Sequence, residues 1–211
     1  MTSAVSSPAS AAPEVVNAAY FDTMFAHSKD PWKFATRWYE QRKRALTLAC
    51  LPQARYASAY EPGCANGELS AALAARCERL LVTDGSERAV ELARKRVAGL
   101  PQVEVRQAWV PDQWPDERFE LIVLSEFLYY LAPNELDVLI ERVRSSLEPG
   151  GCVLACHWRP RIGDAALNGD AVHKRLAQRL GLQQLSALLE PDFRMDIWSD
   201  AASVARRDGL I

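Results

Sequence analysis

The fold of this chain is indicated by one run of residues, Tyr60-Glu61-Pro62-Gly63-Cys64-Ala65-Asn66-Gly67-Glu68-Leu69-Ser70. A short apolar stretch, residues 56–60, leads into this run, and an amphipathic helical pattern leads out of it. After nine more residues comes a second short run, Leu80-Leu81-Val82-Thr83-Asp84, which ends in an acid. The order strand, glycine loop, helix, strand and acid is the outline of a nucleotide-binding βαβ unit. Its glycines let the backbone turn sharply and come close to a ligand.

The glycine loop departs from the dinucleotide fingerprint G-x-G-x-x-G, and the departure predicts the kind of ligand. Ala65 stands at the second glycine position and Glu68 at the third. A glutamate at the start of the helix repels a pyrophosphate, and Glu61 at the end of the first strand adds negative charge. We therefore expect a ligand with positive charge and no phosphate. S-adenosylmethionine fits, because it has a sulfonium, an ammonium and a ribose whose two hydroxyls Asp84 can bind.

Length and composition favour an ordinary globular protein. The 211 residues suffice for one domain with a sizeable core, and the net charge of −2 suggests no nucleic-acid partner. No apolar run approaches the length that spans a membrane. The five cysteines are interpreted as reduced thiols of a cytoplasmic protein, and we expect no metal site at Cys152 and Cys156. The oligomeric state stays open.

The chain divides into three predicted parts. Residues 1–13 are rich in Ala and Ser and are expected to form a disordered tail rather than a signal peptide. Residues 14–52 are expected to be an N-terminal helical addition, with helices over 14–25 and 33–51. Residues 53–211 form the ligand-binding domain.

Strands and helices alternate in the predicted domain, which favours an α/β fold with right-handed crossovers and a mostly parallel sheet. Strand 119–125 is almost continuously apolar at its centre, as in a strand buried on both faces. Ser86 and Asn134 are predicted helix caps. Residues 193–198 are expected to form a half-exposed antiparallel strand near the sheet edge. The remaining predicted strands are 57–60, 80–83, 103–107 and 152–158, and the remaining helices are 68–77, 86–97, 134–147 and 169–189, the last broken at Gly181.

Several motifs together resemble those of class I S-adenosylmethionine-dependent methyltransferases. They are motif I (61–67), the acidic motif Thr83-Asp84, strand 119–125 with the residues that follow it, and Leu147-Glu148-Pro149-Gly150-Gly151. Gly-Cys-Ala-x-Gly (63–67), Ser-Glu-x-Leu-Tyr-Tyr-Leu (125–131) and Asp-Pro-Trp (30–32) are similar to the nodulation protein S family, whose founding members N-methylate a deacetylated chitooligosaccharide. The resemblance covers about residues 21–158.

The resemblance implies a Rossmann-like fold, a helical lid over the cofactor, and S-adenosylmethionine as methyl donor with S-adenosylhomocysteine as product. It also implies methyl transfer to a small-molecule acceptor, an amine such as that of an amino sugar. Another O or N acceptor remains open, as does a regulator that binds the cofactor without catalysis. A nicotinamide-dependent oxidoreductase is disfavoured by the missing glycines and by Glu68.

The predicted cofactor contacts follow the carboxyl edge of the sheet. Glu61 is expected to orient the ligand's ammonium, and an arginine of the helical lid, represented by Arg37, could pair with its carboxylate. The acid that often binds adenine after the third strand is missing before Asp112, so adenine is expected to stack on Trp109 and to bond to backbone amides. The full predicted set is Glu61, Gly63, Cys64, Ala65, Gly67, Asp84, Gly85, Ser86, Ala108, Trp109, Val110, Ser125 and Arg37.

The predicted acceptor side begins after strand 119–125. Glu126 is a candidate general base, an amine-binding carboxylate or a helix cap, and His157 is a second catalytic candidate at the same edge. Of Tyr129 and Tyr130, one is expected to pack in the core and one to line the pocket, where aromatic rings with Trp158 can hold a cationic amine. His27 and His173 are interpreted as structural.

Overall fold

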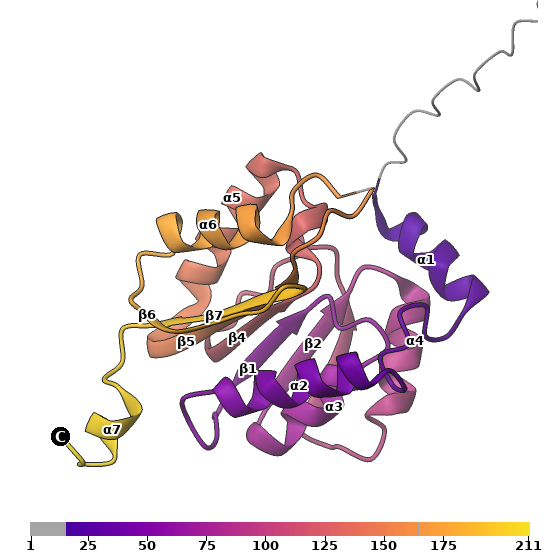
Figure 1. Cartoon of the computed structure of the whole chain (residues 1–211). Coiled ribbons are helices and arrows are strands. Elements are labelled where there is room, and N and C mark those ends of the chain that lie inside the picture. Colours follow the sequence, from indigo (N-terminus) through magenta and orange to yellow (C-terminus); the bar gives the residue numbers. More distant parts are fainter. Residues whose placement is uncertain (1–15, 164) are drawn as a thin grey trace, which may run out of the picture.

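A seven-stranded sheet forms the centre of the protein, which we describe from a computed structural model over residues 16–163 and 165–211 (Figure 1). The expected tail, residues 1–13, lies outside the described residues. The strand order is β3-β2-β1-β4-β5-β7-β6, and only β7 runs against the others within it. The strands are β1 (Ala59–Pro62), β2 (Leu80–Asp84), β3 (Val103–Gln107), β4 (Phe119–Ser125), β5 (Leu147–Trp158), β6 (Gln184–Leu189) and β7 (Phe193–Ser199). The predicted Rossmann-like α/β fold is confirmed.

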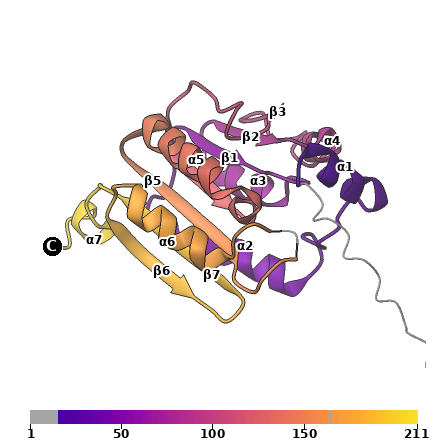
Figure 2. The ribbon, with the colours of Figure 1, turned by 90° about the horizontal axis from the view of Figure 1, so that it is seen from above.

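Helices cover both faces of this sheet (Figures 1 and 2). On one face lie α5 (Pro133–Ser146) and α6 (Gly169–Arg179). On the other lie α2 (Trp38–Cys50), α3 (Glu68–Leu73), the 3-10 turn η1 (Ala74–Arg76) and α4 (Glu87–Arg96). The N-terminal α1 (Ala18–His27) lies beside α4, a second 3-10 turn η2 (Leu128–Tyr130) follows β4, and α7 (Val204–Arg207) lies near the C-terminus.

The core has two halves because the central strands bury side chains on both faces. In β4, Ile122 and Leu124 pack into the half that α5 and α6 cover, whereas Leu121 and Val123 pack into the half under α3 and α4. All four side chains are fully buried. This period of two confirms the apolar run as a central parallel strand.

The C-terminal part differs most from the prediction. Residues 184–189 are not helical but form the edge strand β6, antiparallel to β7. Helix α6 ends at Arg179, and Gly181, at φ 68°, takes the chain into the strand. Strand β7 is antiparallel as predicted but is buried rather than half-exposed, because β6 covers its outer side and its polar Asp196 bonds internally.

Other element boundaries shift for local reasons. The helix expected from residue 33 begins at Trp38, because the Asp30 carboxylate accepts the amides of Phe34 and Ala35 and holds a turn there. Helix α5 begins at Pro133, one residue before the predicted cap. Strand β1 extends to Pro62, so Glu61 lies within the strand. Among the described residues, no helix combines the length and apolar character that a bilayer crossing requires.

Candidate active site

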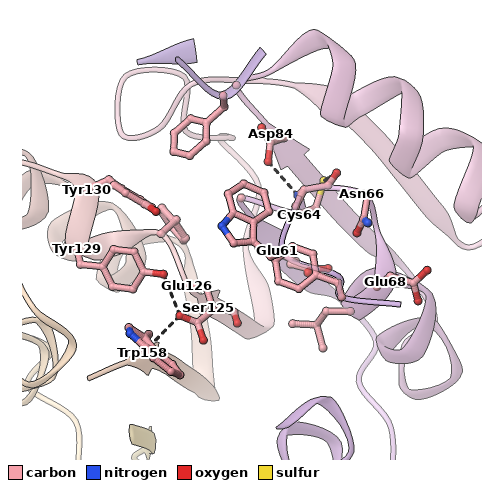
Figure 3. A pocket seen from close by; sticks show the side chains of 18 of the residues that line it. Glu61, Cys64, Asn66, Glu68, Asp84, Ser125, Glu126, Tyr129, Tyr130 and Trp158 are labelled. Atoms are coloured by element: carbon pink, nitrogen blue, oxygen red, sulfur yellow. Dashed lines mark hydrogen bonds between the residues drawn. The ribbon is translucent and has the colours of Figure 1, made fainter. Parts of the chain in front are cut away.

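A cavity of about 780 Å³ opens at the carboxyl ends of β1, β2, β4 and β5. It lies where the chain order of the sheet reverses, between the β1–β2 and β4–β5 sides, the place where open α/β sheets bind ligands. Residues of α1 and α2 line it from the other side. Figure 3 shows two groups of side chains facing each other across this space, one around Glu61 and Asp84 and one around Glu126.

The glycine loop is a tight turn that Asp84 supports. Gly63, Ala65 and Gly67 all have positive φ, at 73°, 49° and 81°. The Ala65 amide donates to one carboxylate oxygen of Asp84 at 2.9 Å, and the Ser86 amide donates to the other at 2.9 Å. A side chain at Gly67 would come within 3.0 Å of the Ala93 backbone, so this glycine permits close packing of α3 on α4. Asp84 therefore fixes the loop as well as facing the cavity.

Glu61 is the most unusual group at this end of the cavity. It is 2% exposed, and its Oε2 atom has no hydrogen-bond partner within the described part of the chain. Burial, with a contribution from the nearby Asp84, raises the pKa of Glu61 to about 8. Burial likewise raises the pKa of Asp84 to about 6. A buried and a half-buried acid, neither with a cationic partner among the described residues, suit a positively charged ligand.

We expect Glu61→Gln to stabilise the ligand-free protein at high pH. The pKa of Glu61 rises from 4.5 to about 8 on folding, so stability is lost as the pH rises through 8. At pH 9 the glutamine variant should unfold with a free energy ~2 kcal/mol or more above that of the wild type. Urea unfolding at pH 5 and pH 9 measures this difference.

The control for this prediction is Glu68→Gln, since the Glu68 carboxylate already pairs with Arg96 at 2.8 Å. That variant should gain no stability between the two pH values. Equal pH dependence in Glu61→Gln and the wild type would show that Glu61 does not hold a proton in the folded protein.

The predicted adenine end is aromatic, but its amides are already used. Ala108, Trp109 and Val110 line the cavity, and the Trp109 indole lies so close to Gly85 that any side chain there would collide with it. The Ala108 amide donates to the Asp84 carbonyl at 3.0 Å, and the Trp109 amide donates to Gln113 at 2.6 Å. Stacking of adenine on Trp109 thus stays a prediction. The backbone amides of Ala108 and Trp109 already donate hydrogen bonds within the protein.

Glu126 lies at the opposite end of the cavity, and its carboxylate accepts hydrogen bonds from three donors. Its Oε1 accepts from the Lys43 ammonium at 2.5 Å, and its Oε2 accepts from the Tyr129 hydroxyl and the Trp158 amide, both at 2.9 Å. Its backbone has φ 62°, a conformation disfavoured outside glycine. This carboxylate is therefore an anchored ion, and both of its oxygens are occupied.

The sequence did not indicate Lys43 and Glu40, which join this group from α2. Lys43 is 7% exposed and also pairs with Glu40 at 3.0 Å. Lys43 and Thr47 are the buried residues of α2. Polar residues at helical spacing on the buried face of a helix are the signal that could have identified this contribution.

The two tyrosines both line the cavity, rather than one of them only. Tyr129, 5% exposed, also packs in the core, and its ring meets that of Tyr130 at 4.8 Å between centroids. Tyr130 in turn packs edge-on against Phe21 of α1 at 5.3 Å. The Trp158 ring packs edge-on against Tyr39 of α2 at 5.7 Å. Aromatic rings thus connect the N-terminal helices to the Glu126 end of the cavity.

His157 is not brought into the cavity. Its side chain is fully buried, and its Nδ1 lies 3.1 Å from Nε2 of His173 on α6. His173 in turn contacts Asp196 through Nδ1 at 2.6 Å. Burial, then the neighbouring His173 and Lys43, lowers the pKa of His157 well below its usual range. The predicted catalytic role is corrected to a neutral structural contact, because successive residues of β5 point to opposite faces.

Most of the predicted site residues do line this one cavity. Gly67 and Ser86 do not: the Ser86 hydroxyl instead donates to Asp22 of α1 at 2.5 Å. The predicted residues found along the cavity are Arg37, Glu61, Gly63, Cys64, Ala65, Asp84, Gly85, Ala108, Trp109, Val110, Ser125, Glu126, Tyr129, Tyr130 and Trp158.

Comparison with known proteins places the chain in a family. The family model described as Nodulation protein S (NodS) matches residues 23–166. Nodulation protein S of Rhizobium tropici is 33% identical over 124 residues, 58% of this chain and 52% of the relative, and that of Bradyrhizobium diazoefficiens is 35% identical over 122 residues, 57% and 58%. The chain thus matches only a little over half the length of these curated relatives.

Solved structures agree in fold. A putative methyltransferase from Pseudomonas syringae is 53% identical, with a TM-score of 0.71, covering 77% of this chain and 99% of that one. The N-methyltransferase NodS from Bradyrhizobium japonicum, in complex with S-adenosyl-L-homocysteine, is 23% identical, with a TM-score of 0.79, covering 86% and 97%. The family match, which spans more than half of the chain, shows that this protein belongs to the nodulation protein S family.

Proposed function

We propose that this protein is an S-adenosylmethionine-dependent methyltransferase that transfers a methyl group to an amine, such as the amine of an amino sugar. The observation that carries the proposal is the buried Glu61 oxygen that lacks a partner and faces a cavity rich in carboxylates. Among the described residues, seven carboxyl side chains line this cavity against three cationic ones. Such a charge balance suits a cationic cofactor and a basic acceptor, and the related Bradyrhizobium japonicum protein holds S-adenosylhomocysteine.

The residues present fit this cofactor. Glu61 would receive the ammonium, Asp84 the ribose hydroxyls, and Trp109 the adenine ring, while Arg37 would pair with the carboxylate. The volume of about 780 Å³ lies within the range that holds a ligand of this size together with a small acceptor. The described part of the predicted lid, residues 16–52, would cover the cofactor, since α1 and α2 contribute lining residues.

The chemistry needs positioning more than activation. The bound cofactor supplies a methyl group already activated by its sulfonium. The acceptor end, with Glu126, Tyr129 and Trp158, would hold the attacking nitrogen in line with that methyl group and exclude water, an alignment that can supply several kcal/mol. Glu126 already accepts three hydrogen bonds, so we assign it to holding the acceptor end together rather than to taking a proton.

Two alternatives keep the same cofactor. Methyl transfer to another small-molecule oxygen or nitrogen would use the same cavity, and a regulator would bind the cofactor without turnover. The hydrogen-bonded charge cluster at the acceptor end favours catalysis, because a simple cofactor receptor does not require it. Turnover with any amine of a panel that begins with amino sugars eliminates the regulator.

We expect S-adenosylmethionine to bind with release of a proton at pH 7. Glu61, with a pKa of about 8, holds a proton in the free protein, and an ammonium at its open oxygen would lower that pKa. Calorimetric titration in buffers of different ionisation enthalpy should show ~0.5–1 proton released per cofactor bound.

The same titration tests the cofactor itself. Binding of S-adenosylmethionine with a Kd on the order of micromolar, without binding of NAD, supports the proposal. A folded wild-type protein that binds NAD and not S-adenosylmethionine would overturn it. In Glu61→Gln the proton release should disappear, which separates this carboxyl from other titrating groups.

A further inference from the structure

The acceptor end contains a buried cation of its own. The Lys43 ammonium lies 2.5 Å from Oε1 of Glu126 and 3.0 Å from Oε2 of Glu40, and it stands 5.1 Å from the Tyr39 ring centroid. All four residues line the cavity. Burial alone would lower the pKa of Lys43, but the negative groups around it, Glu126 foremost, outweigh burial and raise it. The lysine is therefore a permanent positive charge at this place.

This charge matters for an amine acceptor because only a neutral amine can attack. An unpaired carboxylate beside the acceptor would favour the ammonium form, raise the amine's pKa and block its lone pair. In this protein Glu126 is already neutralised by Lys43, and its other oxygen is filled by Tyr129 and the Trp158 amide. The site thus offers polarity without a free negative charge at Glu126.

We propose that Lys43 is a positioning residue that neutralises Glu126, so that the acceptor amine binds beside this pair in its neutral form. The inference rests on the proposed function. The acceptor's ammonium loses its proton to solvent before methyl transfer. Its lone pair then forms the new N–C bond while the C–S bond breaks and its electron pair stays on sulfur. The methylated nitrogen becomes a cation and leaves with the product, since the neutral pair of Lys43 and Glu126 offers it no free counter-charge.

Other titratable groups interact electrostatically with Lys43 or with its partner Glu126, and they set the balance of charge. They come from α2, from the residue that follows β4, from η2 and from β5. These groups are Tyr39, Glu40, Glu126, Tyr129, Cys156 and His157. Burial raises the pKa of Tyr39, Tyr129 and Cys156 and lowers that of His157, so these four stay neutral. Lys43, Glu40 and Glu126 are the groups joined by ion pairs.

The test is the pH profile of kcat in Lys43→Met, with the best primary amine from a panel that begins with glucosamine. The kcat profile reports the ionisation of the bound complex. Loss of Lys43 leaves Glu126 free to hold the ammonium form, so the apparent pKa of the profile should rise by about 1–2 units. At pH 7 kcat should fall ~10-fold or more while KM does not rise.

Matched variants distinguish an effect of the charge balance around Glu126 from structural damage caused by the substitution. Arg42→Met removes a cation from the same helix, but Arg42 pairs with Glu190 at 2.6 Å and does not line the cavity, so the wild-type profile should persist. Lys43→Met combined with Glu126→Gln removes both charges and should return the apparent pKa toward the wild-type value. If Lys43→Met does not fold, Lys43→Gln takes its place, since glutamine keeps a donor for Glu126.

The outcomes distinguish this inference from the proposed function. A wild type that methylates no amine, or does not bind S-adenosylmethionine, overturns the proposed function and this inference with it. A wild type that turns over an amine, with a Lys43→Met profile that superimposes on it, overturns the role of Lys43 alone. An upward shift in Lys43→Met that the double variant reverses, with Arg42→Met unchanged, supports it.

Discussion

Replacing Asp84 with alanine is expected to weaken binding of S-adenosylmethionine by ~100-fold or more. The change removes the proposed acceptor for the ribose hydroxyls. It also removes the bonds from the Ala65 and Ser86 amides to Asp84, which hold the glycine loop and the start of the next helix in place. Hydrogen bonds to a charged group contribute about 1.5–3 kcal/mol each, and a factor of 100 corresponds to about 2.7 kcal/mol. Calorimetric titration of the folded variant measures the loss.

Two further variants locate the cause of this loss. Asp84→Asn keeps one oxygen acceptor and the size of the side chain, so it should bind more tightly than the alanine variant and more weakly than the wild type. Asp112→Ala removes the next acid in the chain after β3, which does not line the cavity, and should bind as the wild type does. An unchanged affinity in Asp84→Ala would show that the ribose lies elsewhere.

The proposed cofactor end of the cavity was predictable from sequence because its signals are local. Gly63, Gly67 and the acid Asp84 mark a βαβ unit through short-range rules of backbone geometry. The loop's closure by the Ala65 amide on Asp84 follows from that same unit, since the two adjacent parallel strands end side by side. The long apolar run of β4 likewise predicted a central strand without knowledge of its neighbours.

The proposed acceptor end, around Glu126, was not predictable in the same way, because it depends on contacts between residues distant in sequence. Lys43 and Glu126 are separated by 83 residues, and no local pattern pairs them. The predicted catalytic role of His157, on β5, was wrong for a related reason. Its position at the carboxyl edge suggested a catalytic group, but the side that it faces depends on the register of β5 against β4 and β7, and it faces α6.

The prediction of a helix over residues 184–189, which form β6, was wrong for a third reason. The run 184–189 is short and apolar, and such runs fit a helix or a strand equally well in the absence of tertiary context. Its pairing with β7 decides the matter, and Leu185 and Leu188 then pack against the core. Tertiary hydrogen bonding here outweighs the helical preference of leucine and glutamine.

Replacing Glu126 with glutamine is expected to lower kcat by ~100–1000-fold while the Kd for S-adenosylmethionine stays within about 3-fold of the wild-type value. Glutamine cannot balance the charge of Lys43, which then stands beside a nitrogen that becomes positive during the reaction. A misplaced charge near a developing charge costs roughly 3–4 kcal/mol, which equals this loss of rate. Steady-state kinetics and calorimetry on the same preparation give both quantities.

The pH dependence of that loss separates two roles for the carboxylate. A general base becomes dispensable at high pH, where the free amine is already neutral, so the deficit of Glu126→Gln would shrink there. A carboxylate that anchors Lys43, Tyr129 and the Trp158 amide remains necessary at every pH, and the deficit should then be constant. Glu120→Gln, at the opposite end of β4 and outside the cavity, should leave kcat unchanged. The three donors already bound to Glu126 favour a constant deficit, since a carboxylate with both oxygens occupied is a poor acceptor for a further proton.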